Sequence, residues 1–166
     1  MLLTTDRLTL REFCPEDLAN LLPFAENPDQ IKYMAFSIKD KKECLSFLNY
    51  AVSESLADKR CEYHIAVVDK VTQIFLGICA LMIEKENPSS AELGYWFNQK
   101  YWGQGYAVEA SRELLRFGFL ELKMHRIWAK CHIENKASAK VMAKCGMVYE
   151  GTIREHIWLR DHYRTR

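Results

Sequence analysis

A loop with two glycines lies between a strand-like and a helix-like pattern, in the sequence KYWGQGYA over residues 100–107. Glycine lets the backbone approach a ligand closely, and the free N–H groups at a helix start favour an anion. Each hydrogen bond to a charged group contributes ~1.5–3 kcal/mol. The loop therefore predicts a phosphate or pyrophosphate site, although two glycines before a helix also form ordinary tight turns.

Other chemistries fit the sequence less well. The glycine loop lacks the GK[ST] of a P-loop, and it lacks the third glycine and downstream acid of a dinucleotide fingerprint. Cys131, His132 and His125 do not have zinc-site spacing, and no acid stands ready to orient a Cys/His nucleophile. We expect no metal site.

Hydrophobic periodicity predicts the elements that position the loop. Strands are expected over residues 6–13, 63–68, 74–84, 91–97, 126–133 and 147–153. Helices are expected from Pro15 to about Asn27-Pro28-Asp29, from Asp40 to Leu56, over 104–122, and over 136–145 with Gly146 as the stop. The order βααβββαβαβ indicates an α/β fold of the α+β type, with one mixed, mostly antiparallel sheet flanked by helices.

Length and charge set further limits. A chain of 166 residues is expected to form a single domain over residues 1–166, and a net charge of +1 gives no global field for nucleic acid or an anionic membrane. No apolar stretch is long enough to span a bilayer, and no signal peptide is evident, so a cytoplasmic protein is expected. The six cysteines lack a CxxC pair and are expected to be buried free thiols.

Three segments carry a family resemblance: ELGYWFNQKYWGQGYAVEA over residues 92–110, HRIWAKCHIENKASAKVMAKCGM over 125–147, and EGTIRE over 150–155. Together they resemble the GNAT superfamily of N-acetyltransferases, and within it the branch of ribosomal-protein N-terminal (alanine/serine) acetyltransferases. The resemblance implies acetyl-CoA as the cofactor. The family's pyrophosphate loop, [RQ]xxGx[GA], falls on Lys100, Gly103 and Gly105, and Lys100 departs from the usual Arg or Gln.

The resemblance also implies where the rest of the cofactor lies. The pantetheine arm is expected along the strand edge, and the second motif is expected to contact the arm and the thioester end. The implied cofactor-binding residues are Tyr95, Trp96, Phe97, Lys100, Trp102, Gly103, Gln104, Gly105, Tyr106, Ala107, Asn135 and Ser138.

Two residues are implied as catalytic. Glu92 resembles the carboxylate that takes the proton of the amine in relatives, often through water; without the resemblance, a solvated strand acid is the simpler interpretation of Glu92. Many relatives use a tyrosine as the acid where this chain has Met142, which cannot donate a proton. Ser138 is therefore the expected partner of the leaving thiol, although a serine near a helix start can also be a cap.

The expected reaction is direct transfer of acetyl to a primary amine, most simply the N-terminal amine of a protein. The alternatives are a small amine (a polyamine, an aminoglycoside or an amino acid) and a non-catalytic acyl-CoA-binding module. The chain is expected to be a monomer or homodimer. The resemblance implies a last sheet strand beyond HIWLRDHYRTR, and because the given sequence stops at Arg166, three alternatives stay open: the strand is missing here, another chain supplies it, or the sheet edge is left open.

Overall fold

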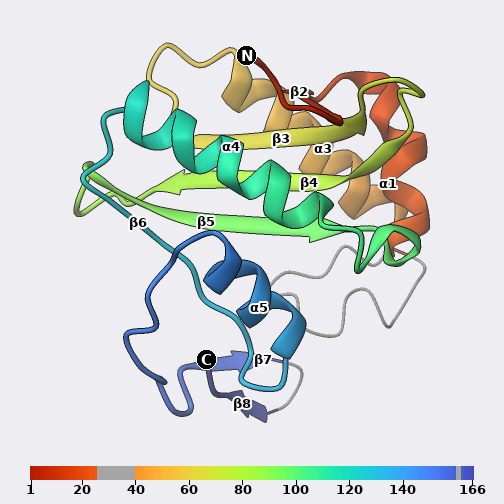
Figure 1. Cartoon of the computed structure of the whole chain (residues 1–166). Coiled ribbons are helices and arrows are strands. Elements are labelled where there is room, and N and C mark those ends of the chain that lie inside the picture. Colours follow the sequence, from red (N-terminus) through yellow and green to blue (C-terminus); the bar gives the residue numbers. More distant parts are fainter. Residues whose placement is uncertain (26–39, 160–161) are drawn as a thin grey trace.

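The structure, a computed structural model, describes residues 1–25, 40–159 and 162–166 (Figure 1). The strands are β1 (Leu2–Thr4), β2 (Leu8–Glu12), β3 (Glu62–Asp69), β4 (Phe75–Ile83), β5 (Ser90–Phe97), β6 (Arg126–Trp128), β7 (Ile157–Leu159) and β8 (His162–Arg164). The α-helices are α1 (Leu18–Ala25), α3 (Lys41–Ser55), α4 (Tyr106–Leu120) and α5 (Lys136–Lys144). Single 3₁₀ turns, η1 (Pro15–Asp17) and η2 (Gln99–Tyr101), precede α1 and the glycine loop. The expected end of the first helix at Asn27-Pro28-Asp29 lies outside the described residues.

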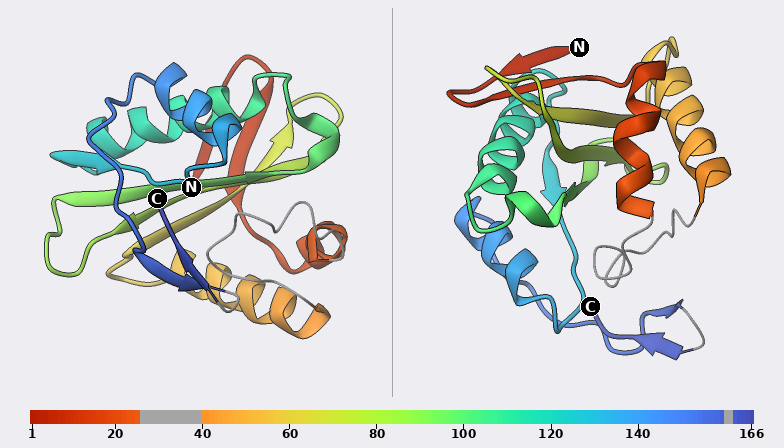
Figure 2. Two further views of the ribbon diagram at one scale, coloured as in Figure 1. Left: turned by 90° about the horizontal axis from the view of Figure 1, so that it is seen from below. Right: turned by 90° about the vertical axis from the view of Figure 1, so that its right-hand side faces the viewer.

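Six strands form one sheet in the order β1-β2-β3-β4-β5-β6. Neighbours from β1 to β5 are antiparallel, and β6 pairs parallel with β5. Helices α4 and α5 lie on one side of this sheet and α1 and α3 on the other, as the right-hand view of Figure 2 shows. This arrangement confirms the predicted α+β fold with a mixed, mostly antiparallel sheet.

Both faces of the sheet are packed, because side chains alternate between faces along each strand. On the α4 face the buried core includes Leu8, Leu10, Ile65, Leu81, Leu93 and Leu114. On the face of α1 and α3 it includes Phe13, Leu21, Leu48, Val68, Phe75 and Trp96. The central strand β4 is therefore a nearly continuous apolar run, and β3 is apolar and buried over Ile65–Val68.

Local signals set most helix ends. The Asp40 carboxylate accepts a hydrogen bond from the Glu43 N–H at 2.8 Å and caps α3. Gly146 follows α5 with φ +85°, a conformation that favours glycine. The expected starts of these two helices are confirmed, while α4 begins at Tyr106 rather than at Gln104.

The C-terminal third corrects the predicted order. The strand expected over 126–133 ends at Trp128, and residues 147–153 form no strand. Instead β7 and β8 pair with each other in a separate two-stranded sheet. A strand needs a neighbour for its N–H and C=O groups, but the chain leaves the sheet after Trp128, and among the described residues of 147–153 the backbone bonds outside helices and strands include a reciprocal pair between Ile153 and Arg166 rather than a ladder to the main sheet. Val148, expected in that strand, is 85% exposed.

Two smaller expectations also change. Strand β1 was not predicted, and it pairs antiparallel with β2 through Leu2 to Arg11 and Thr4 to Thr9. All six cysteines are free thiols, but Cys61 is exposed, whereas Cys44 and Cys79 are buried. No α-helix in the described residues has both the length and the apolar character needed to cross a bilayer.

Candidate coenzyme and catalytic site

The glycine loop lies between the end of β5 and the start of α4, as predicted. Gly105 is the N-cap of α4 with φ +84°, and Gly103 has φ +74°. A Cβ added at Gly103 would meet no atom within 4 Å, so the backbone borders open space there. The first hydrogen bond of the helix runs from the Glu109 N–H to the Gly105 carbonyl. The N–H groups of residues 106–108 precede it and face an anion that enters the loop.

Side chains around the loop hold its shape. Asn98 accepts a hydrogen bond from the Lys100 N–H at 3.0 Å, and the Gln104 side-chain amide donates to the Lys100 carbonyl at 3.1 Å. The Trp102 indole N–H donates to the Phe97 carbonyl at 2.7 Å. Lys100 and Gln104 are exposed, and Trp102 is 50% exposed. These contacts brace the loop backbone and leave the Lys100 ammonium pointing to no partner among the described residues.

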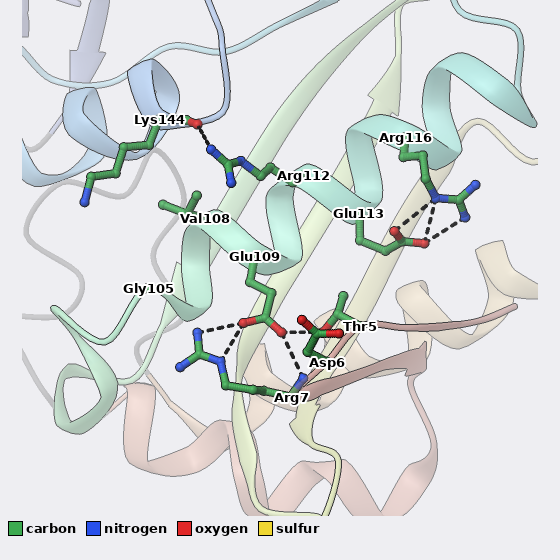
Figure 3. A pocket seen from close by; sticks show the side chains of 10 residues that line it. All are labelled: Thr5, Asp6, Arg7, Gly105, Val108, Glu109, Arg112, Glu113, Arg116 and Lys144. Carbon is green, nitrogen blue, oxygen red and sulfur yellow. Dashed lines mark hydrogen bonds and ion pairs between the residues drawn. The ribbon is translucent and has the colours of Figure 1, made fainter.

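A clamp that sequence reasoning missed ties the N-terminal strands to the first turn of α4 (Figure 3). The Glu109 carboxylate accepts from the Thr5 hydroxyl at 2.5 Å, from the Arg7 N–H at 3.0 Å and from Arg7 Nε at 2.7 Å. Arg7 also donates to the Gln104 carbonyl at 3.2 Å and lies 4.4 Å from the centre of the Tyr106 ring. The clamp thus ties the glycine loop and the first turn of α4 to the segment between β1 and β2.

The clamp also sets the charge state of Glu109. Burial raises the pKa of the Glu109 carboxyl, but the hydrogen bonds from Thr5 and Arg7 outweigh burial and hold that pKa below its usual value. Glu109 is therefore ionised at neutral pH and is balanced by Arg7 at 2.6 Å. The negative charge next to the helix start is neutralised before any anion arrives.

A depression of about 600 Å³ opens along the outer side of α4, beside this clamp (Figure 3). Its residues come from the loop between β1 and β2, from α4 and from the end of α5: Thr5, Asp6, Arg7, Gly105, Val108, Glu109, Arg112, Glu113, Arg116 and Lys144. Arg112 spans from α4 to α5 by donating to the Lys144 carbonyl at 2.5 Å. The depression thus carries both basic and acidic side chains, and two of its arginines are paired with its acids, Arg7 with Glu109 and Arg116 with Glu113.

Strand β5 has a free edge next to the loop. Its pairing with β6 covers Ser90, Ala91 and Glu92. From residue 93 to residue 97 that edge has no strand neighbour in the described part of the chain, while the other edge is paired with β4. Free backbone N–H and C=O groups at such an edge can pair with an extended polar chain.

The start of α5 faces this edge. Asn135 is the N-cap of α5, and its side-chain oxygen accepts from the Ser138 N–H at 3.0 Å. The Tyr95 hydroxyl lies 2.7 Å from the Ser138 hydroxyl and 2.9 Å from the Ser138 carbonyl. Burial raises the pKa of Tyr95 well above its usual value, and the hydrogen bond with Ser138 opposes that shift only in part. Tyr95 is therefore a neutral phenol at physiological pH.

Glu92 has a partner that sequence reasoning missed. Lys130 Nζ lies 2.8 Å from Glu92 Oε2 and 4.9 Å from the centre of the Trp128 ring. Within the part of the chain that the structure describes, Glu92 Oε1 accepts no hydrogen bond. The ion pair fixes the orientation of the carboxylate and leaves one oxygen open.

Glu92 and Ser138 approach β5 from different sides. Tyr95 packs against the core on the α4 face, and it contacts Ser138 there. Trp96 belongs to the core on the face of α1 and α3. Glu92 lies four residues before Trp96 in β5, and because side chains alternate between faces along a strand, Glu92 points to the same face as Trp96. The predicted base and the predicted thiol partner therefore lie on opposite faces of the strand, near the place where β6 departs.

The structure thus brings most predicted site residues to one region. The glycine loop, the free edge of β5 and the start of α5 lie next to one another, whereas the Trp96 side chain is buried on the far face. The missed residues are Thr5, Arg7, Glu109 and Lys130. Glu109 could have been noticed in the sequence as an acidic residue in the first turn of the helix that follows the glycine loop. No local sequence pattern indicates that Thr5 and Arg7 are its partners.

Comparison with known proteins identifies relatives. The sequence profile of the family described as "Acetyltransferase (GNAT) domain" matches residues 7–148. The chain is 36% identical to the uncharacterised protein YkkB of Bacillus subtilis strain 168, over 92% of this chain and 88% of YkkB. It is 30% identical to the ribosomal-protein-serine acetyltransferase of Escherichia coli K12, over 45% of this chain and 41% of that protein.

Solved structures show the same fold. An acetyltransferase of the GNAT family from Bacillus anthracis superposes with a TM-score of 0.86 at 28% identity, covering 99% of this chain and 94% of that one. The matched residues include the glycine loop, Glu92, Asn135 and Ser138 within the range of the family profile.

Proposed function

Because the chain belongs to the GNAT family of acetyltransferases, we propose that the acceptor of its acetyl group is the N-terminal amine of a protein. The chain is an acetyl-CoA-dependent N-acetyltransferase. The observation that carries the rest of the proposal is the juxtaposition at β5: a free strand edge, a helix start with a glycine loop, and an oriented carboxylate at the point where β6 leaves the sheet.

The residues present fit acetyl-CoA, which supplies the acetyl group as a thioester. The N–H groups of the loop at Gly103, Gly105 and the first turn of α4 would hold the pyrophosphate. The open space at Gly103 is the room that the phosphates need. The free edge over residues 95–97 would pair with the pantetheine arm, and Asn135 and Ser138 would lie at the thioester end. Lys100 and Trp102 would border the phosphates from outside the loop.

Glu92 would act as the base. An amine attacks the thioester carbonyl only in its neutral form, so a group must take its proton. Glu92 Oε2 is held by Lys130, and Oε1 is open to accept that proton, directly or through water. A backbone N–H near residues 95–97 would stabilise the carbonyl oxygen, and the Ser138 hydroxyl would donate to the sulfur as it leaves.

Direct transfer fits better than an acetylated enzyme. The cysteine near Ser138 is Cys131, and burial raises the pKa of its thiol, although Ser138 and the charges of Lys136 and Arg166 oppose the shift. A protonated thiol is a poor nucleophile. Glu92 can instead deprotonate an amine bound together with the cofactor.

The charge at Glu92 and the name of one relative favour a protein N-terminus as the acceptor. Glu92 is already balanced by Lys130, so a polycation would find no net negative charge at this point. A protein N-terminus brings a single amine and an extended backbone. One relative is a ribosomal-protein-serine acetyltransferase by name. Small amines, such as a polyamine, an aminoglycoside or an amino acid, are the competing acceptors.

Thiol release from acetyl-CoA tests the acceptor. The panel contains peptides with N-terminal Ala, Ser or Met, the same peptides with blocked N-termini and a free Lys, spermidine, an aminoglycoside and free amino acids. We expect release with the free peptides and none with the blocked ones. Release with a small amine alone would refute the protein acceptor, and tight CoA binding without release on any acceptor would refute catalysis on these acceptors.

Glu92→Gln tests the base. We expect its kcat/KM at neutral pH to fall by about 10²–10⁴-fold, the usual contribution of a general base. Glu150→Gln is the matched control, because Glu150 pairs with Arg126 on the surface and takes no part in the site. If Glu92→Gln keeps the full rate, Glu92 is not the base.

A further inference from the structure

The Tyr95 hydroxyl is placed to act on the reaction through Ser138. It lies 2.7 Å from the Ser138 hydroxyl and 2.9 Å from the Ser138 carbonyl, so one phenol touches two acceptors on the same residue. Tyr95 comes from β5, and Ser138 comes from the first turn of α5, 43 residues later. The contact joins the strand that would bind the pantetheine arm to the helix that would bind the thiol.

The phenol has one proton and a choice of acceptors. If Tyr95 donates to the Ser138 carbonyl, the Ser138 hydroxyl can donate to Tyr95 Oη and is turned away from the sulfur. If Tyr95 donates to Ser138 Oγ, the Ser138 proton is not directed at Tyr95 and can point at the coenzyme sulfur in place of the nearby Cys131 thiol. The carbonyl of Ser138 lies inside α5, where the N–H four residues later is its regular donor. Releasing the phenol from that carbonyl therefore leaves no unpaired backbone group.

We propose that Tyr95 is a positioning residue for acetyl transfer: its hydroxyl donates to Ser138 Oγ and so directs the Ser138 proton to the sulfur of the departing coenzyme. The inference rests on the proposed function, which makes Ser138 the thiol partner. No covalent step passes through Tyr95. One hydrogen bond changes its acceptor, and the Ser138 proton remains on its oxygen while it stabilises the negative sulfur.

The surroundings of Tyr95 favour a donor role over an acid role. Burial raises the pKa of the phenol, so loss of its proton to Ser138 is unfavourable, whereas donation is not. A donor that itself accepts a hydrogen bond is a stronger donor, because neighbouring bonds polarise one another. In this way Tyr95 and Ser138 together replace the tyrosine that is absent at Met142.

The first test measures the thiol of bound CoA and needs no acceptor. The ultraviolet absorbance of the thiolate is followed against pH for the CoA complex, and the same titration with desulfo-CoA, which lacks the sulfur, is subtracted. The subtraction removes the protein groups that titrate nearby. Those groups and fixed charges are Cys79, Cys131, Cys145, Lys136 and Arg166.

Tyr95→Phe deletes the hydroxyl and keeps the ring. We expect the bound thiol to become about fivefold less acidic, the effect of one neutral hydrogen bond. Tyr63→Phe is the matched control: Tyr63 is another partly buried tyrosine of the sheet, and its ring packs against Phe117 away from α5. An unchanged thiol pKa in Tyr95→Phe overturns the inference, and so does an equal change in Tyr63→Phe.

The second test separates positioning from a structural bond. Tyr95→Phe should lower kcat about fivefold, with the KM for acetyl-CoA within about twofold. In a Ser138→Ala background the same change should lower kcat less than about twofold, because the group through which Tyr95 acts is gone. A bond that merely holds α5 through the Ser138 carbonyl survives Ser138→Ala, so an undiminished fivefold loss there would overturn the inference.

The outcomes also distinguish the two proposals. If the protein does not bind CoA, the proposed function fails. If CoA binds with a lowered thiol pKa that Tyr95→Phe leaves unchanged, the proposed function stands and the positioning role of Tyr95 fails.

Discussion

Gly103→Ala should separate coenzyme binding from folding. Gly103 has φ +74°, and a Cβ there would meet no atom within 4 Å. The cost to folding is therefore backbone strain alone, about 1–2 kcal/mol. For a chain of this length each kcal/mol lowers the Tm by roughly 2–4 °C, so the Tm should fall by roughly 2–8 °C.

Gly146→Ala is a matched control for that strain. Gly146 has φ +85°, and its Cβ would also meet no atom within 4 Å, but it follows the end of α5. The two variants should lose similar stability. Only Gly103→Ala places a methyl group in the space proposed for the phosphates and turns the loop N–H groups away from them.

The binding effect follows from the hydrogen bonds lost. One bond from a backbone N–H to a charged phosphate contributes ~1.5–3 kcal/mol, so Gly103→Ala should weaken CoA binding by about 10–150-fold. Calorimetric titration with CoA, at a temperature where both variants are folded, measures this ratio. Acetyl-pantetheine lacks the pyrophosphate and should serve both variants equally as an acetyl donor. If Gly103→Ala and Gly146→Ala bind CoA equally well, the loop does not hold the pyrophosphate.

Two further predictions concern the scaffold. A Cβ on Gly77 would overlap the Trp96 carbonyl and lie 2.8 Å from Phe97 Cα, and these backbone atoms cannot move aside easily. Gly77→Ala should therefore lower the free energy of unfolding by about 3 kcal/mol, as measured by denaturant titration. A loss below about 1 kcal/mol would contradict this packing. The Asp17 carboxyl is 1% exposed, and although burial raises its pKa, hydrogen bonds from Arg11, Cys14 and Asn20 hold the pKa below its usual value. Ionised Asp17 therefore stabilises the fold above its unfolded pKa of about 3.9, and that stability is lost as the pH falls through the lower folded value. Thermal unfolding is measured for the wild type and Asp17→Asn between neutral and acidic pH. The variant should be less stable by about 2 kcal/mol at neutral pH and should lose less stability on acidification. If the stabilities of the two proteins fall in parallel with pH, ionised Asp17 does not stabilise the fold.

Short-range sequence signals, such as helix caps and glycines in turns, predicted much of the fold. Asp40 before an apolar periodic stretch, Gly146 after one, and the glycines of the loop each act on the backbone next to them. For this reason the starts of α3 and α5 and the place of the loop could be predicted. The resemblance to the GNAT family then supplied the role of an anion site that the glycines alone left open.

Contacts between distant residues could not be predicted in the same way. Arg7 and Glu109 are 102 residues apart, and Tyr95 and Ser138 are 43 apart. Each residue by itself fits an exposed or half-buried position. Their pairing depends on the sheet order, which brings the start of β2 beside α4 and the end of β5 beside α5. Hydrophobic periodicity gives the elements but not which polar side chains meet between them.

The early end of β6, which was expected to continue to residue 133, bears most directly on the proposed mechanism. An apolar pattern over 126–133 favours a strand of that length, but β6 ends at Trp128. If β6 had continued beside β5, its backbone would occupy the edge over residues 93–97, where we propose that the pantetheine arm pairs. Lys130 lies two residues after the end of β6 and reaches back to Glu92. The early departure of β6 thus leaves that edge of β5 unpaired and allows Lys130 to orient the Glu92 carboxylate. If the proposed path of the pantetheine arm is right, a variant that extends β6 should lose CoA binding in calorimetric titration even where the glycine loop is intact.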